Sequence, residues 1–65
     1  EGNAPAVLNA ANEVAVARFL NDEIAFAQLP DVVEYALSRV SYQSKPDLEA
    51  HLASDTEARA FALEF

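Results

Sequence analysis

The sequence predicts an all-α fold, a small antiparallel four-helix bundle with three longer helices and one short helix. Fourteen of its 65 residues are alanine, the strongest helix former, and only one residue is glycine. Apolar side chains recur at helical spacing over several stretches. The connections between these stretches are short, as they are between neighbouring helices of an antiparallel bundle.

The length allows one core, so we expect a single domain over residues 1–65. The absence of cysteine excludes disulfides and thiolate metal sites, and a single histidine, His51, excludes a multi-histidine site. The net charge of −7 disfavours binding to nucleic acid or to anionic lipid. No apolar run approaches the ~20 residues of a membrane span. We therefore expect neither a nucleic-acid nor a membrane partner.

The first predicted helix runs from Ala4 to Leu20. Asn3 is the expected N-cap, and Pro5 lies in the first turn, where its missing N–H is tolerated. Apolar side chains cover most of the circumference, which predicts a helix enclosed on several sides. Asn21 is the expected stop at the C-terminal end.

A second helix is predicted from Pro30 to Val40, after a short extended segment whose Ile24 and Phe26 side chains should tuck under the bundle. Its apolar stripe contains Leu29, Val32, Val33, Ala36, Leu37 and Val40. Leu37 lies in the middle of this stripe, so we expect it to be fully enclosed. On that expectation, truncation to alanine would cost about 2–5 kcal/mol.

Two further helices are predicted after a loop at residues 41–45. Ser44 and Asp47 resemble a capping box, which predicts a short helix from Pro46 to Ala53. Ser54 and Glu57 repeat the S-x-x-E pattern and predict the start of a separate final helix. That helix carries an apolar stripe of Ala58, Phe61, Ala62 and Phe65.

The residues with reactive side chains predict no catalytic, cofactor-binding or metal-binding site. Asp47 and His51 could form an oriented general base, but no nucleophile accompanies them, which favours a surface pair. The carboxylates lie mostly at helix starts, where the helix dipole explains them, and no inward Glu-x-x-His motif is present. A glycine-rich phosphate-binding loop is also absent.

The most unusual stretch places Asn9, Asn12 and Glu13 in one narrow sector of the first helix. Asparagine is a mediocre helix former, so propensity does not explain two of them in mid-helix. The sector is either the solvent side of the helix or a polar seam that meets another part of a larger protein. Val16 and Leu20 continue the sector and make full exposure less favourable. These three polar residues are our candidate interdomain contact.

The run from Ala4 to Val16, APAVLNAANEVAV, and the Phe19-Leu20 pair after it resemble the C-terminal region of the 1-deoxy-D-xylulose 5-phosphate reductoisomerase family. The LNAANE run is the most specific part. The resemblance continues in order through Ile24-x-Phe26, Leu29-Pro30, Val32-Val33-Glu34, Leu48-Glu49, Leu52, Asp55 and Ala58-Arg59. It covers nearly the whole chain.

The resemblance implies a C-terminal four-helix-bundle domain of an enzyme that rearranges and reduces 1-deoxy-D-xylulose 5-phosphate to 2-C-methyl-D-erythritol 4-phosphate. The family's enzyme uses NADPH and a divalent metal, Mg²⁺ or Mn²⁺, in the non-mevalonate route to isoprenoids. Its metal, substrate and dinucleotide ligands lie upstream, so no cofactor is expected in this chain. The implied partners are the upstream catalytic and dinucleotide-binding domains of a homodimeric parent. The implied location is the bacterial cytoplasm, or a plastid for a plant or algal source.

Two features depart from the family pattern: Ala27-Gln28 replaces a stronger capping residue, and residues 41–45 fit no pattern. The start at Glu1 without methionine and the end at Phe65 in mid-pattern lead us to expect a piece of a longer protein. We expect a structural domain that is inactive alone. The alternative is a stand-alone helical module that offers an apolar groove to a partner helix.

Overall fold

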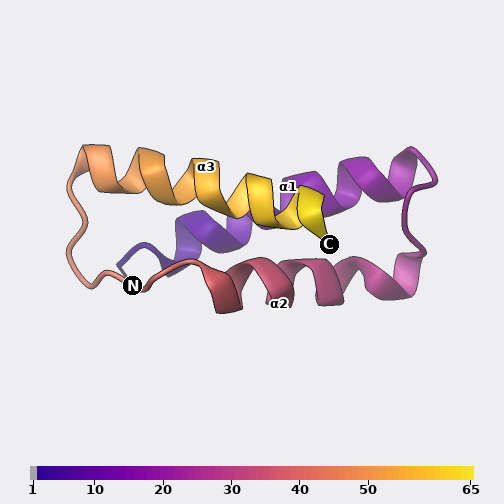
Figure 1. Ribbon diagram of the computed structural model, residues 1–65, viewed down its shortest axis with the longest axis horizontal. Coiled ribbons are helices and arrows are strands. Elements are labelled where there is room, and N and C mark those ends of the chain that lie inside the picture. The colour runs from indigo at the N-terminus through magenta and orange to yellow at the C-terminus, as the bar shows by residue number, and fades with distance from the viewer. Residues whose placement is uncertain (1) are drawn as a thin grey trace.

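The computed structural model describes residues 2–65, which form three α-helices and one short 3₁₀ turn. The helices are α1 (Ala4–Leu20), α2 (Leu29–Arg39) and α3 (Leu48–Glu64), and the turn η1 (Phe26–Gln28) precedes α2. The helices pack side by side, with α2 antiparallel to both α1 and α3 (Figure 1). The all-α prediction is confirmed, and none of the described residues is in a strand.

The prediction of four helices is wrong, because the expected short helix and final helix form one continuous helix, α3. Neither proline nor glycine interrupts the sequence between Leu48 and Glu64, so nothing stops the helix midway. The N-cap is Asp47, whose carboxylate accepts a hydrogen bond of 2.8 Å from the Ala50 amide. Ser54 caps nothing and is buried within the helix.

Asn3 holds the start of α1 in a different way from the prediction, since its side chain makes no cap hydrogen bond to the helix. Its Nδ2 donates to the Ser41 carbonyl at 2.8 Å and to the Ser54 hydroxyl at 3.0 Å. Its Oδ1 accepts from the Gln43 amide at 2.7 Å. Asn3 is only 1% exposed and Ser54 only 3%, so a polar network with a buried centre ties α1, the 41–47 loop and α3 together.

Position 2, next to Asn3 and its network, requires glycine for two reasons. Its φ is +65°, in the left-handed region that glycine adopts without strain. A β-carbon at Gly2 would also collide with the carbonyl of Gln43. The backbone of the domain's first residues therefore packs directly against the 41–47 loop.

α1 ends in a Schellman motif built on Asp22 rather than on glycine. The Glu23 amide donates to the Arg18 carbonyl at 2.8 Å, and the Asp22 amide donates to the Phe19 carbonyl at 3.0 Å. Asp22 has a φ of +61°, a conformation that costs an L-residue energy. Asn21 precedes it as the C-cap, in agreement with the predicted stop.

Replacing Asp22 with glycine is expected to stabilise the chain by about 0.5–1 kcal/mol, because glycine relieves the left-handed strain. Urea unfolding followed by circular dichroism would measure the change. Asn21→Gly is the matched control, since Asn21 has a φ of −94° and gains no such relief. Unfolding of Asp22→Gly at a lower urea concentration than the parent would contradict the expectation.

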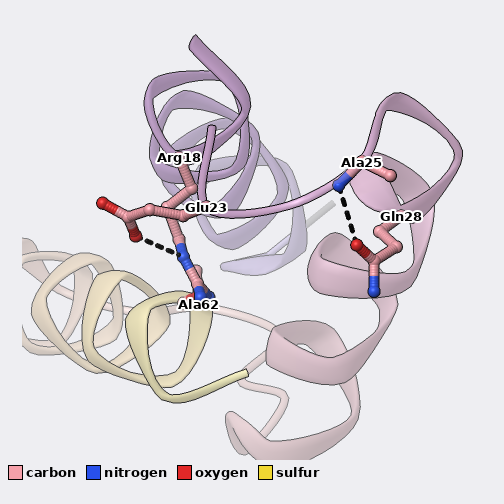
Figure 2. Close-up of polar contacts among 5 residues, drawn as sticks. All are labelled: Arg18, Glu23, Ala25, Gln28 and Ala62. Atoms are coloured by element: carbon pink, nitrogen blue, oxygen red, sulfur yellow. Dashed lines mark hydrogen bonds and ion pairs between the residues drawn. The ribbon is translucent and has the colours of Figure 1, made fainter. Parts of the chain in front are cut away.

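Arg18 joins the ends of α1 and α3 (Figure 2). Its Nη1 donates to the Ala62 carbonyl at 2.8 Å, in the last turn of α3, where carbonyls lack partners within the helix. Its Nε pairs with the Glu23 carboxylate at 3.0 Å. Figure 2 also shows the turn that leads into α2, where the Gln28 side chain accepts a 2.8 Å hydrogen bond from the Ala25 amide and fixes the turn.

The core between the helices is built mainly from alanine. Its fully buried apolar residues include Ala10, Ala11, Ala15, Val32, Ala36, Ala58 and Ala62. Small side chains let the helix backbones approach closely, so little volume separates α1 from α3. Phe65 adds an edge-to-face contact with Tyr35, with ring centres 5.5 Å apart, and ties the end of α3 to α2.

Two predictions about burial are wrong. Ile24 is buried as expected, but Phe26 is 70% exposed and makes an edge-to-face contact with the Phe19 ring. Leu37 is 38% exposed instead of fully enclosed, so the loss of 2–5 kcal/mol expected for Leu37→Ala does not apply. Val32 and Ala36 occupy the central positions instead, because α2 is turned by part of a helical turn from the predicted orientation.

Candidate functional site

An apolar groove lies along α1 and α2, on the outside of the bundle. It has a volume of about 660 Å³, and we call it the α1–α2 groove. Its lining includes Leu8 and Asn12 from α1, Phe26 from η1, and Pro30, Val33, Glu34 and Leu37 from α2. Leu8 is 48% exposed, although leucine is usually buried. The groove is thus an apolar surface with a single carboxylate, Glu34, in its lining.

The structure places the three candidate interdomain residues on the outer side of α1, and all three are exposed. Asn12 lines the α1–α2 groove. Asn9 and Asn12 also line a second hollow beside Leu8 and Pro5. Within residues 2–65, no hydrogen bond holds either asparagine side chain. The structure therefore brings Asn9 and Asn12 together next to apolar side chains.

Glu13, unlike the two asparagines, reaches a residue of α3. Its carboxylate pairs with the Arg59 guanidinium at 2.9 Å, and Arg59 also pairs with Asp55 at 2.9 Å. Hydrogen bonds to Asp55 and Glu13 raise the pKa of Arg59 above its ordinary value, because both carboxylates favour the charged guanidinium. Glu13 thus has a role inside the bundle, as a link between α1 and α3.

The residues weighed for catalysis do not form a site. Asp47 caps α3 through the Ala50 amide, which explains its position without a neighbouring base. His51 is half-buried one turn later, and no hydrogen bond joins it to Asp47 through their side chains. Among residues 2–65, no group of three or more His, Cys, Asp or Glu side chains could hold a metal ion. No helix in that part of the chain is long and apolar enough to cross a membrane.

Sequence analysis missed the α2 wall of the groove, Pro30, Val33 and Leu37. Val33 and Leu37 follow the same helical spacing as the buried residues, so both were assigned to the core, whereas Pro30 was expected only to open the helix. The predicted apolar stripe of α2 is wider than one buried face, and this width could have shown that part of it lies outside the core. Leu37 lies about 140° around the helix from Val32, too far for both to face the same pair of neighbouring helices.

The chain matches known proteins over most of its length. A family model described as the DXP reductoisomerase C-terminal domain matches residues 1–61. The 1-deoxy-D-xylulose 5-phosphate reductoisomerase of Bacteroides fragilis is 48% identical over 63 residues, which cover 97% of this chain and 16% of the relative. That of Listeria welshimeri is 52% identical over 60 residues, covering 92% of this chain and 16% of the relative.

The relatives are much longer than this chain. The reductoisomerase of Lachnospira eligens, for example, is 51% identical over 53 residues, which are 82% of this chain but only 14% of that protein. The chain therefore spans about a sixth of the length of the curated relatives it matches. The resemblance carried by the LNAANE run is confirmed. The chain belongs to the family of DXP reductoisomerase C-terminal domains.

Proposed function

We propose that this chain is the structural C-terminal domain of a reductoisomerase that converts 1-deoxy-D-xylulose 5-phosphate to 2-C-methyl-D-erythritol 4-phosphate. The observation that carries the proposal is the family match over residues 1–61, together with relatives that bear the reductoisomerase name. The parent enzyme is proposed to use NADPH and Mg²⁺ or Mn²⁺, as a homodimer in the bacterial cytoplasm. The chain itself would stabilise the enzyme and take no part in the chemistry.

The residues of this chain do not fit either cofactor. The glycine-rich turn that binds a dinucleotide pyrophosphate needs several glycines, and the single glycine, Gly2, packs against Gln43. The carboxylates are dispersed into helix caps and ion pairs such as Arg59–Asp55. We therefore assign NADPH and metal binding to the domains that precede this one, and we derive no reaction step through this chain.

Asn9, Asn12 and Glu13 are proposed to lie at the contact with those preceding domains. The support comes from two exposed amides beside exposed apolar side chains, with Val16 on the same sector. An amide surrounded by apolar surface suits an interface in which a partner group completes its hydrogen bonds. Glu13 would border this contact while remaining paired with Arg59.

Asn12→Ala is expected to be nearly neutral in the 65-residue chain, where Asn12 is exposed, or slightly stabilising through better helix propensity. In the parent enzyme it should destabilise by about 1–3 kcal/mol, because a buried partner group would lose its hydrogen bond. Urea unfolding of both proteins would compare the two effects. Equal effects in the two contexts would contradict the interdomain contact.

An active chimera would test the proposed function directly. In the Bacteroides fragilis reductoisomerase, this chain would replace the matching 63-residue region, and substrate-dependent NADPH oxidation would be measured. We expect turnover within about tenfold of the unaltered enzyme, a difference of about 1.4 kcal/mol in barrier. A matched chimera carrying Val32→Asp, which buries a carboxylate in the core, should lose stability and activity.

A folded chimera without turnover would count against the reductoisomerase role. The α1–α2 groove would then favour the second candidate function, a helical interaction module that binds a partner helix. The two candidates differ in one respect that can be measured. An interaction module would bind its partner without any dependence on the preceding reductoisomerase domains.

A further inference from the structure

Three leucines of α3 form an exposed apolar stripe on the outside of the bundle. Leu48, Leu52 and Leu63 are each at least 60% exposed, and none of them lines the α1–α2 groove. Together with Arg59 they lie within a sector of about 60° around α3, because successive residues of a helix are about 100° apart. Leucine is usually buried, and grouped apolar side chains mark an interaction site more often than an ordinary surface.

The stripe borders α1, because Arg59 in the middle of it pairs with Glu13 of α1. Glu13 is exposed, and two exposed apolar side chains, Val16 and Leu20, lie within about 60° of it around α1. The exposed apolar surface therefore continues from α3 onto α1. We call it the α1–α3 face, and it consists of Val16, Leu20, Leu48, Leu52 and Leu63 around the Glu13–Arg59 pair.

The middle of the α1–α3 face has one negative charge in excess. The Arg59 guanidinium pairs with Glu13 and with Asp55, both at 2.9 Å, so one cation serves two carboxylates. Within residues 2–65, no second cation pairs with either carboxylate, and both side chains are partly exposed to water. A partner that covers the face has to supply a cation, because a buried charge without a partner is costly.

A second copy of this chain does not meet that requirement. It would bring an identical face, with the same negative excess, against this one. The net charge of −7 on each copy would add to the repulsion. The relatives are about six times longer than this chain, so a partner from elsewhere in the same polypeptide is available without that repulsion.

We infer that the α1–α3 face packs against one of the preceding domains of the longer polypeptide, through an apolar surface that carries a lysine or arginine opposite Glu13 and Asp55. The inference rests on the proposed function, and it extends the proposed contact at Asn9, Asn12 and Glu13 from α1 onto α3. Docking buries the exposed leucines of α3. The partner's cation completes a balanced set of two positive and two negative charges.

Thiol labelling of single-cysteine variants tests whether the face is covered, and the chain has no cysteine of its own. Leu52→Cys and Leu63→Cys report on the face in the Bacteroides fragilis chimera. Ala53→Cys is the matched control, because Ala53 is exposed on the same helix but lies about 100° around it from Leu52. Peptide mass spectrometry gives the labelling rate of each introduced cysteine separately from those of the relative, and circular dichroism verifies that each variant is folded.

Leu52→Cys and Leu63→Cys should react at least about tenfold more slowly than Ala53→Cys, although all three positions are exposed in this domain. Equal rates for the three cysteines would overturn the inference. Protection that is lost on dilution of the chimera would assign the face to a contact between two copies, and would also overturn it.

The charge of the partner is tested by adding Glu13→Gln to each cysteine variant. Arg59 keeps its pair with Asp55, so a cation on the partner is left without its counter-charge. Labelling of the two face cysteines should then become at least about threefold faster. Glu57→Gln is the matched change at an exposed position of α3 and should leave the rates unaltered. Protection that Glu13→Gln leaves unchanged would overturn the basic partner.

These outcomes are separate from those of the activity test. A chimera that turns over substrate while Leu52→Cys and Leu63→Cys stay reactive would overturn the covered face and leave the reductoisomerase role intact. Protection of the face in a folded but inactive chimera would support the covered face and count against the proposed function.

Discussion

Asn3→Ala is expected to destabilise the chain by about 2–4 kcal/mol. The substitution removes two donated hydrogen bonds and one accepted bond from a side chain that is 1% exposed. Each buried polar group left without a partner costs about 1–3 kcal/mol, and Ser54 has no access to water as a replacement. A domain of this size has a net stability of only about 3–5 kcal/mol, so the substitution should remove most of it.

Urea unfolding followed by far-ultraviolet circular dichroism would measure this loss. Asn9→Ala is the matched control, because Asn9 is an exposed asparagine on α1 and its loss should change stability by less than about 0.5 kcal/mol. If the two variants unfolded at the same urea concentration, the buried network around Asn3 would not contribute as described.

Ala58→Leu is expected to cost about 3 kcal/mol, at the upper end of the range for overpacking a core. Ala58 is fully buried in a cluster with Val7 and Ala10, where α1 and α3 approach closely. The added carbons can be accommodated only by separating the helices, which would also strain the Asn3 network at the same end of the bundle.

Ala60→Leu separates overpacking from helix propensity, since Ala60 is exposed on the same helix and receives the same side chain. Thermal unfolding should show Ala60→Leu within a few degrees of the parent and Ala58→Leu far below it. A pair of variants with equal melting temperatures would contradict the alanine-mediated packing of α1 on α3.

Helical periodicity predicted α1 with its observed bounds and α2 within one residue. It worked because these signals are local: alanine-rich sequence, prolines in the first turn and an unbroken apolar stripe. The division of α3 into two helices failed because an S-x-x-E pattern also fits a helix interior. Ser54 lies in mid-helix, where its side chain makes a tertiary contact. It accepts a hydrogen bond from Asn3, which is 51 residues earlier in the sequence.

Sequence alone could not identify Asn3 as a buried residue, because the same side chain is a good N-cap in any helix. Its actual partners come from a loop and a helix that only the folded chain brings close. The prediction that Leu37 is fully enclosed was wrong for a related reason. Its spacing indicates a helix, but only the packing angle of α2 determines whether it faces the core or the α1–α2 groove.

The interdomain role of Asn9, Asn12 and Glu13 stays a prediction. Asn9 and Asn12 do share an exposed, partly apolar face, as the 100° spacing of helical residues requires. Glu13, about 40° further round from Asn9, reaches Arg59 on α3. A helical projection gives the direction of each side chain, but it contains no information about which neighbouring helix lies there.

The central claim is that this domain is structural and binds neither cofactor of the proposed parent enzyme. Isothermal titration calorimetry of the 65-residue chain with NADPH, and separately with Mg²⁺ and Mn²⁺, measures this most directly. The account predicts only heats of dilution up to millimolar ligand, because the chain has one glycine and dispersed carboxylates. A saturable, stoichiometric heat for NADPH or for either metal would contradict it.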